Sequence, residues 1–186
     1  MELILASNSP RRKELLTKGG YVFSIIKSDF EELLLTNDPI TTAVSFAQGK
    51  ANDVYLHLED KTDKIVLGAD TVVCLDGEIL GKPKDKVDAI RMLKLLSGKT
   101  HKVVTGFCVI LNDKIVTDYD VTDVTFNKLT KEKINEYISS GLYVGKAGSY
   151  GIQDGFNLVE KISGSLNNVI GLPTEKVFSL LDKLIK

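Results

Sequence analysis

The apolar positions in the first half of the chain predict strands and helices in alternation. Apolar runs at residues 3–6 and 21–26 are typical of strands, and between them a serine and a proline favour a helix that starts near Ser9. Residues 41–58 predict a further helix, because their apolar residues recur at helical spacing. Residues 64–80 predict a long strand, a two-residue turn at Asp76 and Gly77, and a short return strand.

The second half of the chain continues this alternation but is richer in strands. The segment after the return strand predicts a helix that ends before Gly98 and has Val87, Ile90 and Leu93 on one face. Residues 101–129 are rich in β-branched and aromatic residues and predict two or three antiparallel strands, with a break at Asn112 and Asp113. A capped helix at 129–140, a strand at 157–164 and an amphipathic helix at 173–186 follow. The last helix is expected to turn inward Val177, Phe178, Leu181, Leu184 and Ile185.

This order of elements predicts the class of fold. Strands alternate with helices, but the hairpins make an all-parallel sheet unexpected, so we predict an α/β fold with a mixed, twisted sheet flanked by helices. No repeat, low-complexity run or linker divides the chain, and we therefore expect one domain over residues 1–186, with a bilobed shape. The glycine-rich stretch at 141–155 is expected to form a hinge or a lip.

Charge and cysteine content narrow the classes of function. The chain has 24 Lys and Arg against 25 Asp and Glu, so no overall charge attracts it to nucleic acid or to an acidic membrane surface, and any anion site must be local. Cys74 and Cys108 lie in apolar, strand-like runs, which predicts buried, reduced thiols and suits a cytoplasmic protein. The sequence shows no signal-peptide pattern and no apolar run of about 18 residues, so no membrane association is expected.

The segment S-N-S-P-R-R-K at residues 7–13 is the first candidate site. Ser9 is a favoured N-cap, so Arg11, Arg12 and Lys13 lie in the first helical turn, where each cation is unfavourable by about 0.3–1 kcal/mol. The hydroxyls of Ser7 and Ser9, the free helix amides and the guanidinium groups together suit a chain of phosphates. The alternative is a capped surface helix with solvated basic side chains.

Asp70 is the second candidate, because it interrupts an otherwise apolar strand. A buried carboxylate is costly unless it is paired, hydrogen-bonded or bound to a metal. Asp70 is therefore expected to bind Mg²⁺ or to accept a proton from an attacking water, and the alternative is a structural hydrogen bond. Glu31 and Glu32 follow a strand, where a helix N-terminus or plain surface exposure explains them about as well as metal binding.

Three more polar residues lie in segments that suit a ligand. Lys82 is in a turn bounded by a glycine and a proline, and Lys50 is on a predicted helix beside its alanine face. Gln153 lies in the glycine-rich stretch, and its amide offers one donor and one acceptor, which complements the imide edge of uracil or thymine. For the lysines the alternative is solvation, and for Gln153 it is an exposed loop.

Taken together, these segments resemble the Maf family of nucleoside triphosphate pyrophosphatases. Six motifs occur in the family's order and approximate spacing and span nearly the whole chain. They are S-x-S-P-R-R at 7–12, G-A-D-T-V-V at 68–73, G-K-P at 81–83, L-S-G-x-x-H-x-V-x-T at 96–105, K-A-G-x-Y-G-I-Q at 146–153 and N-V-I-G-L-P at 168–173.

The resemblance implies an activity and a fold. It implies hydrolysis of a nucleoside triphosphate between its α and β phosphates, with a divalent cation, Mg or Mn, and with the nucleotide as the main partner. It also implies an elongated α/β fold with a central cleft, shared in outline with the inosine triphosphate pyrophosphatases, and a homodimer. The motifs G-A-D-T and K-A-G-x-Y-G-I-Q are similar to those of the dTTP/UTP branch, which implies a pyrimidine substrate (dTTP, UTP or a modified pyrimidine nucleotide) and a nucleotide-pool house-cleaning role.

The resemblance also implies a role for each motif residue. Asp70 resembles the proton acceptor, and it would hold the metal together with Glu31. The positions linked to substrate choice are Arg11, Thr71 and Gln153. The residues that would bind the phosphates are Ser7, Ser9, Arg12, Lys50 and Lys82. The chain departs from the family pattern at Gly145, where many members have Asp, and in the loop after Gln153, which is a residue shorter than the common version.

Two other functions remain open from the sequence. One is a purine triphosphate pyrophosphatase of the inosine type. The other is a regulator of septum formation that senses nucleotides without turnover, since the family's name derives from a septum-formation phenotype. A purine enzyme would prefer purine triphosphates, and a sensor would bind nucleotide tightly without releasing pyrophosphate.

Overall fold

The computed structural model describes residues 1–185, and strands and helices alternate along them as the apolar pattern predicts. Lys186, the last residue of the predicted C-terminal helix, lies outside the described residues. The elements are β1 (Glu2–Leu5), α1 (Pro10–Lys18), β2 (Phe23–Ile25), α2 (Pro39–Leu56), β3 (Lys64–Leu75), β4 (Glu78–Leu80), α3 (Lys86–Leu96), β5 (Thr100–Leu111), β6 (Lys114–Phe126), α4 (Lys131–Ser139), the short 3-10 helix η1 (Ala147–Ser149), β7 (Val159–Ser163), α5 (Leu166–Ile170) and α6 (Thr174–Ile185).

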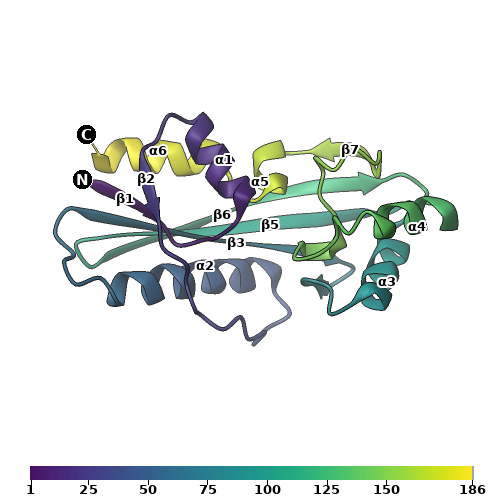
Figure 1. Cartoon of the computed structure of the whole chain (residues 1–186), viewed down its shortest axis with the longest axis horizontal. Coiled ribbons are helices and arrows are strands. Elements are labelled where there is room, and N and C mark those ends of the chain that lie inside the picture. The colour runs from purple at the N-terminus through teal and green to yellow at the C-terminus, as the bar shows by residue number, and fades with distance from the viewer. Residues whose placement is uncertain (186) are drawn as a thin grey trace.

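A seven-stranded mixed sheet connects these elements and confirms the predicted fold class. The strand order is β2-β1-β3-β5-β6-β7, and β4 pairs with the end of β3. β1 is parallel to both of its neighbours, and the other pairs are antiparallel. In Figure 1 the long strands β3, β5 and β6 run along the molecule, with α2 on one face and α1, α5 and α6 on the other.

The predicted hairpins form at their predicted turns. Asp76 and Gly77 connect β3 to β4, and Asn112 and Asp113 connect β5 to β6. Both residues of each turn have positive φ angles, between 49° and 86°. This conformation is typical of the tight turns that match the right-handed twist of paired strands, and Asn, Asp and Gly adopt it most readily.

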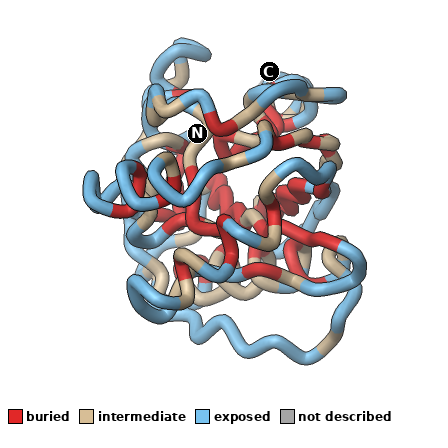
Figure 2. Tube along the Cα trace, turned by 90° about the vertical axis from the view of Figure 1, so that its right-hand side faces the viewer, coloured by how far each residue is buried: buried red, intermediate tan, exposed pale blue. Residues whose placement is uncertain are grey.

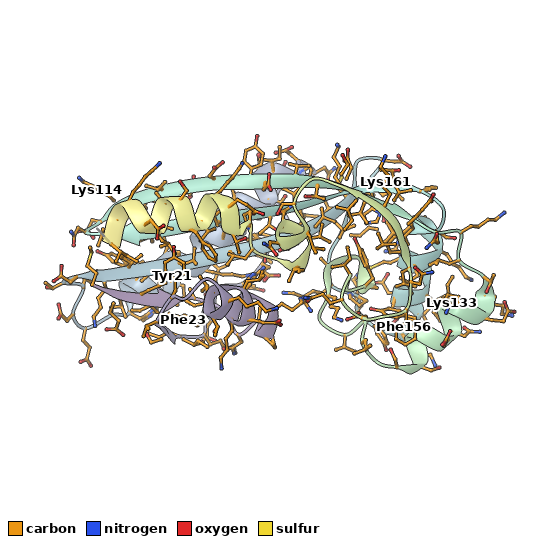
Figure 3. All side chains as sticks on the ribbon, turned by 90° about the horizontal axis from the view of Figure 1, so that it is seen from above. Tyr21, Phe23, Lys114, Lys133, Phe156 and Lys161 are labelled. Carbon is orange, nitrogen blue, oxygen red and sulfur yellow. The ribbon has the colours of Figure 1, made fainter. Side chains whose placement is uncertain are left out.

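The buried side chains form two large clusters, one in each half of the elongated molecule, and two smaller clusters between α2 and the sheet. One cluster lies between β1, α1 and α6, and another lies among α3, α4 and the ends of β5 and β6. Viewed from above, Tyr21 and Phe23 lie at one end, and Lys133 and Phe156 lie at the other (Figure 3). Figure 2 shows the buried segments concentrated at the centre, whereas the loop between β2 and α2 is mostly exposed. The bilobed shape therefore has a separate packed core in each lobe.

Helix α2 packs directly on the sheet because two facing positions in the strands are glycine. A Cβ atom at Gly68 of β3 would lie 2.3 Å from the carbonyl oxygen of Ala47, and one at Gly106 of β5 would lie 2.5 Å from the backbone of Ala43. Such close approach requires glycine. Lys50, one turn further along α2, is thereby held against the middle of β3.

Some details of the predicted helices are wrong. Val87 is 75% exposed because it lies in the first turn of α3, and the buried face of that helix is formed by Ala89, Met92, Leu93 and Leu96. Ile185 is 42% exposed at the end of α6, where the core has already ended, whereas Val177 and Leu181 are buried as predicted.

The state of the cysteines and the character of the helices can be compared with the expectations from the sequence. Cys74 and Cys108 are free and buried, as the sequence predicts. Among the helices of residues 1–185, none combines the length and the apolar character that crossing a membrane requires.

Candidate active site

A cleft of about 520 Å³ opens between the two lobes. Its walls come from the start of α1, the middle of β3, α2, the turn after β4, the loop at 144–154 and the segment after α5. All of the predicted site residues except Glu31 line it. They are Ser7, Ser9, Arg11, Arg12, Lys50, Asp70, Thr71, Lys82 and Gln153. Residues that are far apart in the sequence therefore meet at one surface, although geometry alone leaves their individual roles as predictions.

Arg12 is a buried cation that connects three elements. Ser9 caps α1 and accepts from the Arg12 backbone amide at 3.5 Å, which directs the side chain inward. The guanidinium donates to the Gly171 carbonyl at 2.8 Å, to Ser7 Oγ at 3.1 Å and to Thr71 Oγ1 at 3.2 Å. Burial lowers the pKa of Arg12, but a guanidinium stays charged in proteins. It therefore places a fixed positive charge in the wall of the cleft.

Asp70 lies at the centre of a chain of alternating charges. It is only 5% exposed, and Lys50 Nζ lies 2.5 Å from its Oδ1. The same ammonium is 2.7 Å from Glu32 Oε1, and Lys82 Nζ is 2.9 Å from Glu32 Oε2. Two acids and two bases thus compensate one another beside the cleft.

The two carboxylates of this chain differ in their affinity for protons. Burial raises the pKa of Asp70, although Lys50 and Arg12 act in the opposite direction. Burial would also raise the pKa of Glu32, but the two lysines outweigh it, and the pKa is lowered. A raised pKa makes Asp70 the better proton acceptor, and a lowered one keeps Glu32 ionised.

The structure brings Glu32, and not Glu31, to this cluster. Phe30 packs on α2 at Gly49, where a Cβ atom would lie 2.4 Å from the phenyl ring. The Asp29 amide also donates to the Asp53 carboxylate of α2 at 2.7 Å. These contacts aim Glu32 at Lys50, whereas the Glu31 side chain forms no hydrogen bond or ion pair within residues 1–185.

A metal role for Glu31 therefore stays a prediction without support from the geometry. The sequence offered two adjacent acids in an irregular loop. Only the contacts that anchor the loop on α2 distinguish which of them points toward the cleft, and no short-range pattern encodes those contacts.

The carboxylates beside the cleft fit a hard divalent cation that also binds substrate phosphates. Within the described residues, no group of three or more His, Cys, Asp or Glu side chains could hold a metal by itself. Mg²⁺ commonly takes only one or two protein carboxylates and completes its shell with water and phosphate oxygens. Asp70 and Glu32, which share Lys50 between them, match that pattern.

Gln153 lines the cleft from a loop with internal support. Lys146 and Asp154, which flank the segment, form an ion pair with both side chains 11% exposed. Tyr150, in the same loop, is buried, and its hydroxyl lies 2.8 Å from His101 Nε2. The sequence did not predict the contacts that join Lys146, Asp154 and Tyr137. The glycines of this stretch indicate flexibility rather than a fixed network of side chains.

The cleft brings a buried carboxylate, Asp70, together with arginine and lysine side chains, which suits a polyanionic small molecule. The chain belongs to the Maf family, since residues 2–184 match the family described as Maf-like protein. The resemblance noted from the sequence motifs is thereby confirmed.

Curated relatives match nearly the full length of the chain. The dTTP/UTP pyrophosphatase of Aquifex aeolicus (strain VF5) is 43% identical over 185 residues, covering 99% of this chain and 96% of the relative. The dTTP/UTP pyrophosphatase of Bacillus anthracis is 48% identical over 178 residues, covering 95% and 92%. A crystal structure of a nucleoside-triphosphatase / dITP/XTP pyrophosphatase from Mycobacterium abscessus aligns over 98% of this chain and 95% of its own, with a TM-score of 0.45 and 14% identity.

Proposed function

We propose that this protein hydrolyses pyrimidine nucleoside triphosphates, dTTP and UTP, to the monophosphate and pyrophosphate. The observation that carries the proposal is Asp70, a buried carboxylate of raised pKa that faces a cleft walled by cations. The names of the full-length relatives support the same substrate class. The proposal extends to modified pyrimidine nucleotides, whose removal would give the enzyme a house-cleaning role in the nucleotide pool.

The phosphate end of the cleft is suited to a triphosphate. Arg11 lines it and is oriented by a 3.3 Å hydrogen bond from its Nε to the Ile170 carbonyl. Arg12 adds a fixed charge in the wall of the cleft, and Lys82 is half-exposed and free to exchange Glu32 for a phosphate oxygen. Cations placed where negative charge develops on the leaving pyrophosphate stabilise the transition state more than the ground state.

Asp70 is proposed to take the proton of the attacking water. Lys50 engages Oδ1 at 2.5 Å, and Oδ2 has no hydrogen-bond partner within residues 1–185, which leaves it available to the water. Asp70 and Glu32 would also hold the divalent cation, Mg or Mn. That cation supplies charge neutralisation to the triphosphate when it is bound.

Gln153 is proposed to recognise the base. Its amide group, with one donor and one acceptor, complements the imide edge of uracil or thymine. Because Gln153 and the arginines line the same cleft, one extended nucleotide would contact both. Arg11 and Thr71 are proposed to contribute to substrate choice as well.

A panel of triphosphates tests the proposal. UTP, dTTP, CTP, ITP and GTP are incubated with Mg²⁺ or Mn²⁺, and monophosphate, pyrophosphate and orthophosphate are quantified separately. The expected result is UMP or dTMP with an equal amount of pyrophosphate. In ¹⁸O-labelled water, attack at the α phosphorus places the label in the monophosphate. Orthophosphate release, purine preference or tight binding without turnover would each contradict the proposal.

Several features of the cellular protein belong to the same proposal. The free thiols suit the cytoplasm, and the family resemblance favours a homodimer and a single domain over residues 1–186. Neither nucleic acid nor a membrane is a proposed partner, because the net charge is only −1. Light scattering coupled to gel filtration tests the dimer.

A further inference from the structure

The loop that carries Gln153 is closed by a partly buried ionic network. Lys146 Nζ lies 2.5 Å from each carboxylate oxygen of Asp154, so the ion pair spans the base of the loop. Tyr137 of α4 donates its hydroxyl hydrogen to Asp154 Oδ2 at 2.6 Å. The same hydroxyl oxygen accepts from the Gly151 amide at 3.2 Å. Three side chains and one backbone amide thus form a continuous network.

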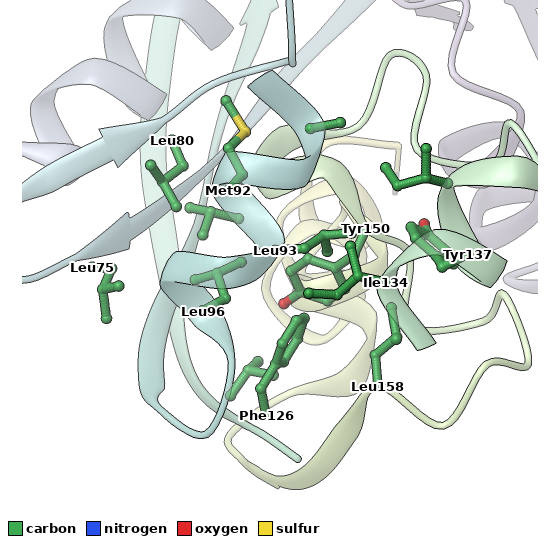
Figure 4. Close-up of a cluster of buried hydrophobic side chains, with 14 of the residues drawn as sticks. Leu75, Leu80, Met92, Leu93, Leu96, Phe126, Ile134, Tyr137, Tyr150 and Leu158 are labelled. Carbon is green, nitrogen blue, oxygen red and sulfur yellow. The ribbon is translucent and has the colours of Figure 1, made fainter. Parts of the chain in front are cut away.

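This network fixes the loop to the core of one lobe. Tyr137 is fully buried, and Figure 4 shows it in one cluster with Ile134, Tyr150 and Leu158. The ion pair packs onto the loop itself, since a Cβ atom at Gly151 would lie 2.7 Å from both Asp154 oxygens and from Lys146 Nζ. The loop is therefore held from α4 and across its own base.

The residues inside the closed loop are those that face the cleft. Gly151, Ile152 and Gln153 all line it, and Gln153 is bonded directly to Asp154 along the chain. A shift of Asp154 would therefore move the Gln153 backbone with it. Since hydrogen bonds lose strength over a few tenths of an ångström and with angle, the position of this backbone determines how well the amide meets a base.

The network also controls charge in the cleft. Lys146 lines the cleft, and without Asp154 its ammonium would be a further site for phosphate in addition to Arg11 and Lys82. The turn that carries Lys82 contacts the same loop, because the Gly148 amide donates to the Gly81 carbonyl at 3.1 Å. Pairing with Asp154 compensates the charge of Lys146, so this lysine competes less with the other cations for a triphosphate.

We propose that Tyr137 and Asp154 are positioning residues that set the selectivity for the pyrimidine base, because they hold Gln153 in place and neutralise Lys146. The inference rests on the proposed function. The proposed positioning involves neither the attacking water nor the metal. Asp70, Lys50 and Glu32 are therefore expected to function normally when Tyr137 or Asp154 is replaced.

The test compares Tyr137→Phe and Asp154→Asn with a matched pair elsewhere in the molecule. Tyr21 Oη donates to Asp182 Oδ1 at 2.7 Å in the other lobe, so Tyr21→Phe and Asp182→Asn remove the same kind of bond away from the cleft. The readout is kcat/KM for UTP divided by kcat/KM for GTP. We expect this ratio to fall roughly tenfold in the first pair, which corresponds to one hydrogen bond to a charged group. In the control pair it should stay within about twofold.

Each variant has a distinct signature. Asp154→Asn frees the Lys146 ammonium, so inhibition by inorganic tripolyphosphate should strengthen in this variant. Tyr137→Phe keeps the ion pair, so its inhibition by tripolyphosphate should remain as in the wild type. Because Tyr137→Phe changes a single atom, it supplies a folded variant even if Asp154→Asn unfolds, which melting curves report.

A double-variant cycle distinguishes an effect that acts through the position of Gln153 from a general loss of protein stability. If Tyr137 acts through Gln153, then adding Tyr137→Phe to Gln153→Ala changes the UTP/GTP ratio no further. The proposal is overturned if the folded single variants keep the wild-type ratio, or if the two effects add in full. Failure of the proposed function would be visible earlier, as a wild-type enzyme that makes no pyrophosphate from UTP.

Discussion

The Lys50 ammonium contacts both Asp70 and Glu32, two carboxylates whose pKa values are shifted in opposite directions. It touches both at 2.7 Å or less, yet the pKa of Asp70 is raised by burial while that of Glu32 is lowered by the two lysines that it faces. Environments that push neighbouring pKa values apart are typical of sites with divided acid and base roles.

Replacing Asp70 by Asn should remove the proposed proton acceptor while preserving the shape of the strand. We expect kcat to fall by a factor of about 10² or more, with nucleotide still bound, because a general base contributes on that scale. Steady-state kinetics and calorimetric titration of UTP check the two halves of this expectation. Turnover close to the wild-type value would refute the role of Asp70.

Glu31 and Glu32 give a direct comparison of sequence and structure. Glu32→Gln should raise the Mg²⁺ concentration needed for half-maximal rate roughly tenfold, since a charged ligand is replaced by a neutral one. Glu31→Gln is the adjacent matched variant and should have a smaller effect, because its side chain lies away from the cluster. The reverse order of effects would return the metal role to Glu31.

His101 makes stability depend on pH. It is 2% exposed, and burial lowers its pKa to about 4. Native His101 therefore stays neutral between pH 6.5 and 4, whereas the unfolded chain binds a proton there, so acid favours unfolding.

The contribution of neutral His101 to the free energy of unfolding is complete above pH 6.5. It is lost as the pH falls toward 4, by up to about 3 kcal/mol, since one pKa unit is worth about 1.4 kcal/mol. Urea unfolding at several pH values measures it. His101→Gln should flatten this dependence, and an unchanged slope would argue against a neutral buried His101.

At the scale of elements, the close packing of α2 on the sheet determines where the chain of charges through Lys50 and Asp70 forms. Gly68 and Gly106 let the helix approach the strands, and the approach holds Lys50 beside Asp70. Because backbone atoms lie against both glycines, the contact has no flexible side chain that could move aside.

Gly68→Ala should therefore cost stability and activity together. A Cβ atom 2.3 Å from the Ala47 oxygen forces helix and strand apart, which typically costs about 1–3 kcal/mol. Gly81→Ala is the control for stability, since nothing lies within 4 Å of its Cβ position. Denaturant unfolding and kcat for both variants test the expectation, and a Gly68→Ala protein of wild-type stability would contradict it.

The elements that the sequence predicts well are those encoded by local patterns. The alternating strands, the turns at Asp76 and at Asn112, and the capped start of α1 depend on neighbouring residues, and all of them form. Helix α5 was not predicted because its five residues are too short for a periodic signal. The choice of Glu32 over Glu31 and the Tyr137–Asp154 contact depend on residues that are distant in sequence, so local patterns carry no information about them.

At the scale of the whole molecule, continuous strands join the two lobes. β3 pairs with β5 from Ile65 to Cys74, and this stretch includes Asp70 and Thr71 at the floor of the cleft. Figure 1 shows these strands running through both halves of the molecule. A sheet paired in this way resists bending, so the floor is already formed before any ligand binds.

Nucleotide binding should therefore change the loops and not the sheet. We expect slower amide hydrogen exchange at 26–38 and 145–154 when UTP is bound to the Asp70→Asn variant, with little change in β3 and β5. Exchange measured by mass spectrometry reports each segment. Strong new protection throughout α3 and α4 would indicate instead that the lobes rotate on binding.

The chain of charges from Asp70 through Lys50 and Glu32 to Lys82 has a consequence for turnover. Its four formal charges cancel, so the resting cleft already holds internal counterions for its own cations. On the proposed function, binding of a triphosphate would be an ion exchange, in which phosphate oxygens displace Glu32 from Lys82. The displaced carboxylate would compete for the lysine again after the reaction, and this competition would favour departure of the pyrophosphate product.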